Sequence, residues 1–414
     1  MSNLINISFD RIIFKLLCLY AFFIPLEKIL EIIFGIDTVF KPYRVIAIII
    51  LFTFVIKSFY KWHVNKELKT DIFLYVIFVY GAMVTIYRMI STNFHLGYFY
   101  NDTFQIVLYL GIFIVIKHSK ISLNNIQTII KSLALGVIVN IIYILFSFFI
   151  LRRFAHRDTG FMDNPNYLAL SLVLLVLLML NYRSLISGFY KTISWWLLLL
   201  SIGYIFIVAG SRSGLAVLIL SGLIVFYFSS LKEKLIIVVL CIGMFFFIGF
   251  LTGLSYKTVG SLSLLNRINK NSQNDPRFPA WRGAVRSAEA TNFVGTGIGQ
   301  FKARFKEFYY QENNELIRKM IVRGYFLSPH SDYFALLAVY GIVGLLSYLL
   351  FLFLTIKNIY IKAYEAINVD EKLYYQYAFL AFMVLILFGI TAENFNSALY
   401  WIVIGTSSKI NFES

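Results

Sequence analysis

The chain has 414 residues, of which 59% are hydrophobic and only 14% are charged, and its formal net charge is +16. This composition excludes an ordinary soluble domain, because one aqueous core cannot bury so much apolar surface. Apolar runs recur from end to end, and most are long enough as helices to cross roughly 30 Å of hydrocarbon. The sequence therefore predicts an all-α integral membrane protein.

Charged residues divide the apolar runs into about twelve predicted spans. Basic residues gather in the short connections after the second, fourth, sixth, eighth and tenth spans, which predicts that these connections are cytoplasmic. Both termini are then expected inside, and we expect the first span to remain uncleaved because no small-residue cleavage site follows it. The predicted spans are 12–33, 43–60, 71–90, 103–117, 125–150, 165–181, 192–209, 212–229, 234–254, 331–356, 373–390 and 394–408.

One long polar segment, 255–330, separates the ninth span from the tenth. We expect it to form a large periplasmic loop between two membrane bundles, 1–254 and 331–414. Residues 255–329 include twelve basic and five acidic side chains, a net charge of +7. Loops of this length can be translocated regardless of charge, but external positive charge also suits an anionic lipid or a phosphate-bearing substrate. Nucleic acid fits poorly, because the charge lies on the wrong side and no binding module accompanies it.

Polar sequence beside the span ends supplies the candidate site residues. Asn164-Pro165-Asn166 precedes the sixth span and is typical of a turn that begins a helix. The amides of Asn164 and Asn166 are also candidate substrate contacts. Arg212, in Gly-Ser-Arg-Ser-Gly, opens the eighth span, where free helix N–H groups and a planar guanidinium can face one phosphate. The alternative is an interfacial arginine that reaches lipid headgroups.

The long loop and the span after it contain further candidates. Arg277 and Arg282 lie in the polar external sequence Asp-Pro-Arg-Phe-Pro-Ala-Trp-Arg and are candidate substrate contacts. His330 follows Ser-Pro at the start of the tenth span, with Asp332 two residues later. The positive end of a helix disfavours imidazolium, so a neutral His330 is suited to act as a general base. It is equally compatible with a cap or a headgroup contact.

Other familiar site chemistries are not supported. Gly295, Gly297 and Gly299 alternate in Gly-Thr-Gly-Ile-Gly and could let backbone approach a phosphate, but no strand precedes them, so a dinucleotide fingerprint is not indicated. The two cysteines, Cys18 and Cys241, both fall in apolar runs, and no external cluster has metal-ligand spacing. We therefore expect neither a metal nor a cofactor.

The order of these segments resembles the O-antigen ligase and O-antigen polymerase superfamily of bacterial membrane glycosyltransferases, over about residues 12–408. The matching elements are Asn-Pro-Asn at 164–166, Gly-Ser-Arg-Ser-Gly-Leu at 210–215, Arg277 with Trp281 and Ala284, Gly-Thr-Gly-Ile-Gly at 295–299, and His330 followed eleven residues later by Gly341.

The resemblance implies specific roles for three residues. Arg212 and Arg277 are similar to the arginines that bind the lipid diphosphate, and His330 to the histidine that activates the acceptor hydroxyl. The family has asparagine after this histidine in many members, whereas this chain has Ser331. Arg282 has no counterpart in the family pattern.

The implied reaction is an inverting, metal-independent transfer of a glycan from undecaprenyl diphosphate at the outer face of the inner membrane. The acceptor is a second lipid-linked repeat unit for a polymerase, or lipid A core for a ligase. The long basic loop favours the polymerase, which must hold two diphosphate lipids. Membrane lipid and a chain-length regulator are further implied partners. A transporter or flippase of the same lipid is a third reading, but the sequence shows no repeated halves.

Overall fold

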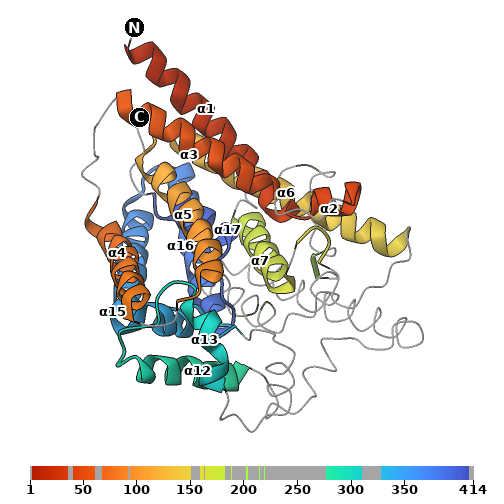
Figure 1. Ribbon diagram of the computed structural model, residues 1–414. Coiled ribbons are helices and arrows are strands. Elements are labelled where there is room, and N and C mark those ends of the chain that lie inside the picture. Colours follow the sequence, from red (N-terminus) through yellow and green to blue (C-terminus); the bar gives the residue numbers. More distant parts are fainter. Residues whose placement is uncertain are drawn as a thin grey trace.

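The structure is a computed structural model, and the regular elements among its described residues are all helices (Figure 1). The described residues are 2–35, 41–60, 68–91, 94–150, 159–162, 164–181, 277–309 and 328–409, with the isolated positions 188, 202, 203, 214 and 219. The predicted spans 192–209, 212–229 and 234–254 lie outside these ranges, apart from the isolated positions. The all-helical prediction is therefore confirmed only for the described part of the chain.

Five described helices, α4, α5, α6, α15 and α16, are long and apolar enough to cross a membrane, and α7 and α17 are shorter apolar helices. All seven overlap predicted spans, although α5 begins earlier and α15 ends later than predicted. The elements are α1 (Ser2–Phe23), a 3₁₀ turn (Ile24–Leu26), α2 (Ile29–Phe34), α3 (Pro42–Tyr60), α4 (Leu68–Ser91), α5 (Leu96–His118), α6 (Leu123–Phe149), α7 (Pro165–Asn181), α12 (Arg277–Ala290), α13 (Gln300–Tyr309), α15 (Asp332–Glu365), α16 (Val369–Thr391) and α17 (Ala398–Ser407).

The predicted first span, 12–33, is not one continuous helix. α1 ends at Phe23, and the 3₁₀ turn that follows contains Pro25 and leads into the separate short helix α2. Proline lacks the N–H that would continue an α-helical ladder, which accounts for the break. The backbone N–H of Lys28 donates instead to the carbonyl of Phe161, at 2.8 Å.

The described helices pack against one another, and a cluster of aromatic side chains lies around Trp401. α15 packs against α4 and α16, α1 against α3 and α6, and α17 against α5. Trp401 of α17 is fully buried, with ring centroids 5.1 Å from Phe395, 5.9 Å from Phe78 and 6.1 Å from Phe113. Its indole N–H donates to the carbonyl of Phe395 at 2.7 Å, so the connection before α17 is anchored to the core.

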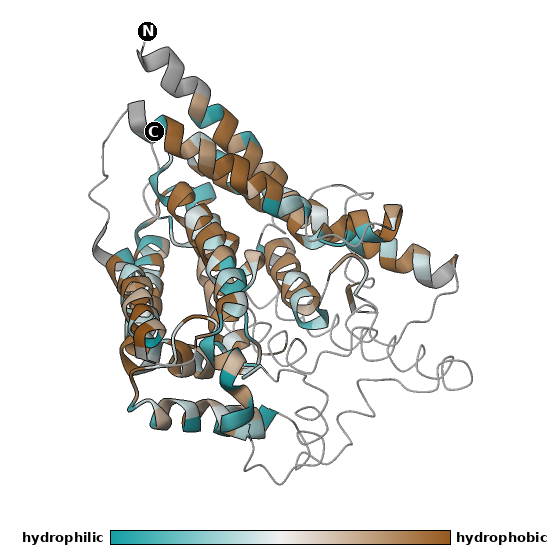
Figure 2. Ribbon diagram, viewed as in Figure 1, coloured by the Kyte–Doolittle hydropathy of each residue, from teal (hydrophilic) through white to brown (hydrophobic). Residues whose placement is uncertain are grey.

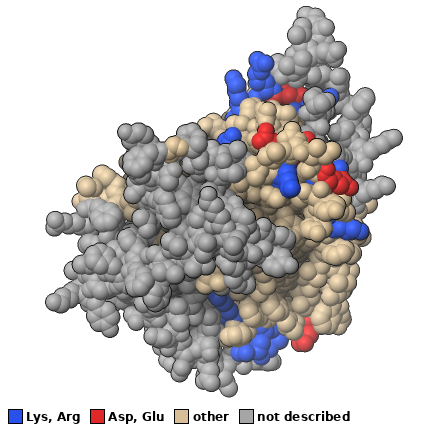
Figure 3. Space-filling view, turned by 180° about the vertical axis from the view of Figure 1, so that it is seen from behind, with Lys and Arg blue, Asp and Glu red and all other residues tan. Residues whose placement is uncertain are grey.

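α12 and α13 lie across the end of the bundle opposite the start of α1 (Figure 1). They are mostly teal and white in Figure 2, whereas bundle helices such as α3 and α4 are mostly brown. Lys and Arg gather at the upper and lower parts of the face in Figure 3, with a broad band of other residues between them. This distribution matches two polar surfaces on either side of a hydrocarbon layer. The end with α12 and α13 is the predicted external end.

The Gly-Thr-Gly-Ile-Gly segment and the residues before it form hydrogen bonds with α15 where that helix is interrupted. At Gly341 the helix adopts φ 64° and ψ −165°, which interrupts its hydrogen-bond ladder. The carbonyl of Ala338 instead accepts from the N–H of Thr296, at 3.0 Å, and Ile342 donates to the carbonyl of Phe293, at 2.9 Å. Backbone groups at membrane depth must be satisfied internally, and here the inserted segment provides the partners.

The same segment is attached to α4 and α5. Ile298 donates its N–H to the hydroxyl of Thr85 at 2.9 Å, and the Gln300 amide exchanges hydrogen bonds with the backbone N–H and carbonyl of His95. Lys302 pairs with Asp102 at 2.6 Å. The described part of the predicted loop 255–330 is therefore built into the bundle.

The three alternating glycines allow a close approach to neighbouring helices. A Cβ at Gly295 would lie 2.6 Å from the carbonyl oxygen of Val339, and one at Gly299 would lie 2.6 Å from the nitrogen of Phe99. All three glycines have positive φ. The residue type is thus explained by helix contact, without a phosphate.

Candidate active site

His330 lies in a short turn that precedes α15. Its φ is 50°, in the left-handed region that few non-glycine residues adopt, and its N–H donates to the hydroxyl of Ser328 at 3.1 Å. Ser331 is the N-cap residue, and its hydroxyl donates to the carbonyl of Gly389 at 3.1 Å. The turn therefore fixes the half-buried His330 immediately before the positive end of α15.

The connection between α16 and α17 holds this turn from the other side. The hydroxyl of Ser328 donates to the carboxylate of Glu393. Asp332 is completely buried, and its Oδ1 accepts the N–H groups of Asn394, at 2.6 Å, and Phe395, at 2.8 Å. These contacts give Asp332 a positioning role in the fold, because one carboxylate oxygen aligns two backbone amides of the connection.

Glu393 is a half-buried ionisable group beside the His330 turn. Burial raises the pKa of its carboxyl above the ordinary value, while the hydrogen bond from Ser328 and the charge of Lys302 act in the opposite direction. Asn396 also donates to it, at 2.9 Å. Because burial dominates, the charged form is disfavoured in the folded protein.

Replacing Glu393 by glutamine is expected to make the protein more thermostable than wild type at pH 8, by a few degrees, and equally stable near pH 4.5. A raised folded-state pKa contributes stability that is present below the unfolded pKa and is lost as the pH rises through the folded value. Thermal unfolding of the purified protein at both pH values measures the effect. Glu289→Gln, on the exposed surface of α12, is the control and should show no such difference. A Glu393→Gln benefit that does not change with pH would contradict the assignment.

α12 brings the arginines of the predicted loop to the start of α15. The indole of Trp281 stacks on the ring of Phe334, with centroids 5.2 Å apart and planes at 19°. Arg277 precedes Trp281 by one helical turn and shares its side of α12, which faces α15. Arg282, the next residue after Trp281, is exposed. The structure thus brings Arg277 and His330 to the same junction of α12 with α15.

Asn164 and Asn166 form the turn that was predicted to begin the sixth span. The side-chain oxygen of Asn164 accepts the N–H of Asn166 at 2.8 Å, and α7 begins between them at Pro165. Tyr167, in the first turn of α7, donates its hydroxyl to the carbonyl of Glu393 at 3.0 Å. The start of α7 is therefore joined to the connection that supports His330. Arg212 lies outside the described residues.

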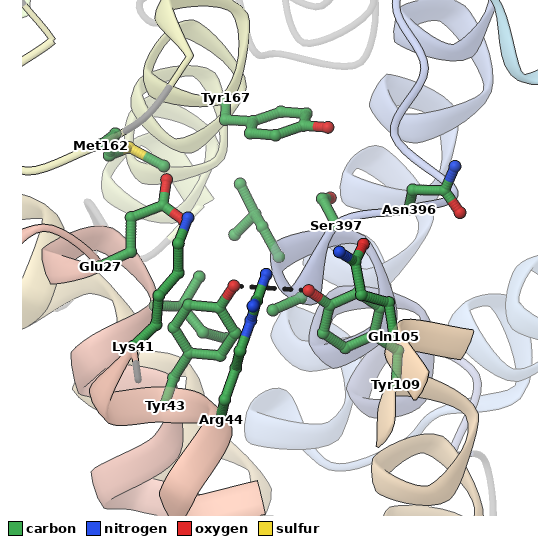
Figure 4. Close-up of a pocket in the computed structure, with 13 residues that line it drawn as sticks. Glu27, Lys41, Tyr43, Arg44, Gln105, Tyr109, Met162, Tyr167, Asn396 and Ser397 are labelled. Atoms are coloured by element: carbon green, nitrogen blue, oxygen red, sulfur yellow. Dashed lines mark hydrogen bonds and ion pairs between the residues drawn. The ribbon is translucent and has the colours of Figure 1, made fainter. Parts of the chain in front are cut away.

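A polar cavity of about 180 Å³ opens on the other side of this connection (Figure 4). Asn396 and Tyr167 form part of its wall, and Arg44 projects into it from the first turn of α3, between Tyr43 and Tyr109. None of the predicted site residues that the structure describes lines it.

The sequence reasoning missed this cavity and Glu393. The signal that could have found both is the short polar run Ala-Glu-Asn-Phe-Asn-Ser at 392–397 between two apolar spans, together with the Lys-Pro-Tyr-Arg sequence at the start of the second span. Among the described residues, no group of three or more His, Cys, Asp or Glu side chains could hold a metal ion.

No curated protein matches the chain. Residues 196–349 match the model of a family described as O-antigen ligase, and this segment includes Arg212, Arg277 and His330. The match covers less than half of the chain and supports its resemblance to the O-antigen ligase and polymerase superfamily.

Proposed function

We propose that the protein is a surface-polysaccharide polymerase that transfers a glycan from undecaprenyl diphosphate to a sugar hydroxyl of a second lipid-linked repeat unit. The observation that carries the proposal is the junction of α12 with α15, where the Trp281–Phe334 stack brings the side of α12 that bears Arg277 to the turn that bears His330. This junction lies inside the segment that matches the O-antigen ligase family.

The chemistry follows from the residue types. His330 removes the proton from the acceptor hydroxyl, whose oxygen then bonds to the anomeric carbon of the donor as the bond from that carbon to the phosphate oxygen breaks. The electron pair leaves with the diphosphate, and attack from the opposite face inverts the configuration. Arg277 and Arg212 stabilise the charge on the departing diphosphate, a task suited to guanidinium groups that do not lose their protons.

The ligase is the second candidate. The matched family is described as O-antigen ligase, and the same chemistry would transfer a glycan to lipid A core as the acceptor. The length and positive charge of segment 255–330 favour the polymerase, since two diphosphate-bearing lipids must be held at once.

A gel of surface lipopolysaccharide from a strain that lacks the gene tests the proposal. We expect single repeat units on the lipid A core, because an inactive polymerase leaves the ligase of the cell with unpolymerised units. Long chains that accumulate on the carrier lipid and never reach the core would instead identify the protein as the ligase. A strain with unchanged lipopolysaccharide would argue against both functions, and complementation with the wild-type gene is the control.

A further inference from the structure

The cavity beside Arg44 carries an excess of positive charge. The ionisable side chains among its described lining residues are Glu27, Lys41 and Arg44, together with the tyrosines Tyr43 and Tyr109. Lys41 and Glu27 pair with each other at 2.9 Å, on one side of the cavity in Figure 4. This pairing balances two of the three charges and leaves the guanidinium of Arg44 as the net charge of the described lining.

Three helices begin at this cavity. Arg44 lies in the first turn of α3, Tyr167 in the first turn of α7, and Ser397 is the N-cap of α17, with Ala398 and Leu399 of its first turn also in the lining. Each helix start carries partial positive charge and N–H groups without intrahelical partners. Three converging starts therefore reinforce the charge of Arg44 and favour an anion.

Arg44 also has unused hydrogen-bonding capacity. Its Nε is buried and has no hydrogen-bond partner among the described residues. The hydroxyl groups of Tyr43 and Tyr109 lie 3.4 Å apart beside it, and Figure 4 shows the guanidinium between the two rings. A buried donor without a partner costs free energy, which an oxyanion that accepts from Nε would recover.

From these features we propose that the cavity binds the diphosphate of a second polyprenyl-linked saccharide, the acceptor, with Arg44 as its principal contact. The inference rests on the proposed polymerase function, which requires two such lipids. The cavity lies between α5, which is long and apolar enough to cross a membrane, and the shorter apolar helices α7 and α17, and this setting suits a headgroup that is attached to a lipid tail. Its wall is joined to the catalytic turn, because Glu393 accepts from Asn396 of the cavity and from Ser328 before His330.

Native mass spectrometry of the full-length protein with undecaprenyl diphosphate as the probe tests the inference by counting bound lipids. We expect two per wild-type chain, one for Arg44→Gln, one for Arg277→Gln and none for the double variant. Arg304→Gln is the matched control and should bind two, because Arg304 is on α13, pairs with Glu307 and does not line the cavity. Far-ultraviolet circular dichroism confirms that each variant is folded.

Other results would overturn the inference in distinguishable ways. If Arg44→Gln binds two lipids and Arg277→Gln binds one, the cavity is not a binding site for the acceptor lipid. The proposed function would not be affected by that result. If the wild-type chain binds only one lipid, and either substitution abolishes that binding, the two arginines contact the same lipid at one site. The wild-type protein could instead keep bound phosphatidylglycerol in the presence of excess undecaprenyl diphosphate. If Arg44→Gln then loses the phosphatidylglycerol, the cavity is a site for a phospholipid headgroup. A wild-type chain that binds no undecaprenyl diphosphate would overturn the proposed function as well.

Discussion

Replacing His330 by alanine is expected to lower the rate of glycan transfer by about 10²- to 10⁴-fold, the usual contribution of a general base. The acceptor hydroxyl would then have no group positioned to take its proton. The measurement is transfer in membranes or in purified protein, with lipid-linked repeat units as both donor and acceptor. Binding of undecaprenyl diphosphate should persist, because the arginines that we assign to the diphosphate remain in place.

Two further variants separate chemistry from structure at this position. The φ of 50° at His330 strains alanine, whereas asparagine tolerates the left-handed region and is not a base at neutral pH. His330→Asn should therefore keep wild-type thermal stability and still lose transfer. His95→Ala is the control, because the Gln300 amide bonds to the backbone of His95. Wild-type turnover by His330→Asn would refute the base assignment.

Local sequence signals predicted most of the described helices. The apolar runs that predict spans at 71–90, 125–150 and 165–181 coincide with α4, α6 and α7 to within about three residues. These elements are predictable because membrane helices satisfy their own backbone and reveal themselves by length and hydropathy alone. The 3₁₀ turn at Pro25 interrupts an equally apolar run, and only the proline and the two charges that follow it indicated the break.

Contacts between segments distant in sequence were the part that could not be predicted. Arg277 and His330 could be proposed as partners only through the resemblance, since the contact of α12 with the start of α15 depends on Trp281 stacking on Phe334. Arg44 precedes Asn396 by some 350 positions, and no periodicity links them. In the sequence, Arg44 is an ordinary basic residue near the start of a predicted span, and its position there gave no reason to single it out.

Replacing Gly341 by alanine is expected to destabilise the protein more than the same replacement at Gly35 or Gly97. The backbone at φ 64° and ψ −165° is accessible essentially to glycine alone, at a cost of about 1–3 kcal/mol for other residues. A Cβ there would also lie 2.2 Å from the carbonyl oxygen of Phe293, so the docked segment would have to move. Thermal unfolding and protease cleavage within 291–299 measure the loss.

Two glycines with different surroundings separate strain from steric clash. Gly35 has φ +65° with nothing within 4 Å of a Cβ, so Gly35→Ala should show strain alone and a small decrease in Tm. Gly97, in α5, has open space and no positive φ, so Gly97→Ala should be neutral or slightly stabilising. If Gly341→Ala lowers Tm only as much as Gly35→Ala does, the packing of residues 293–297 into α15 contributes little to stability. A larger loss, with new cleavage in 291–299, would mean that the break in α15 depends on the inserted segment for its hydrogen bonds.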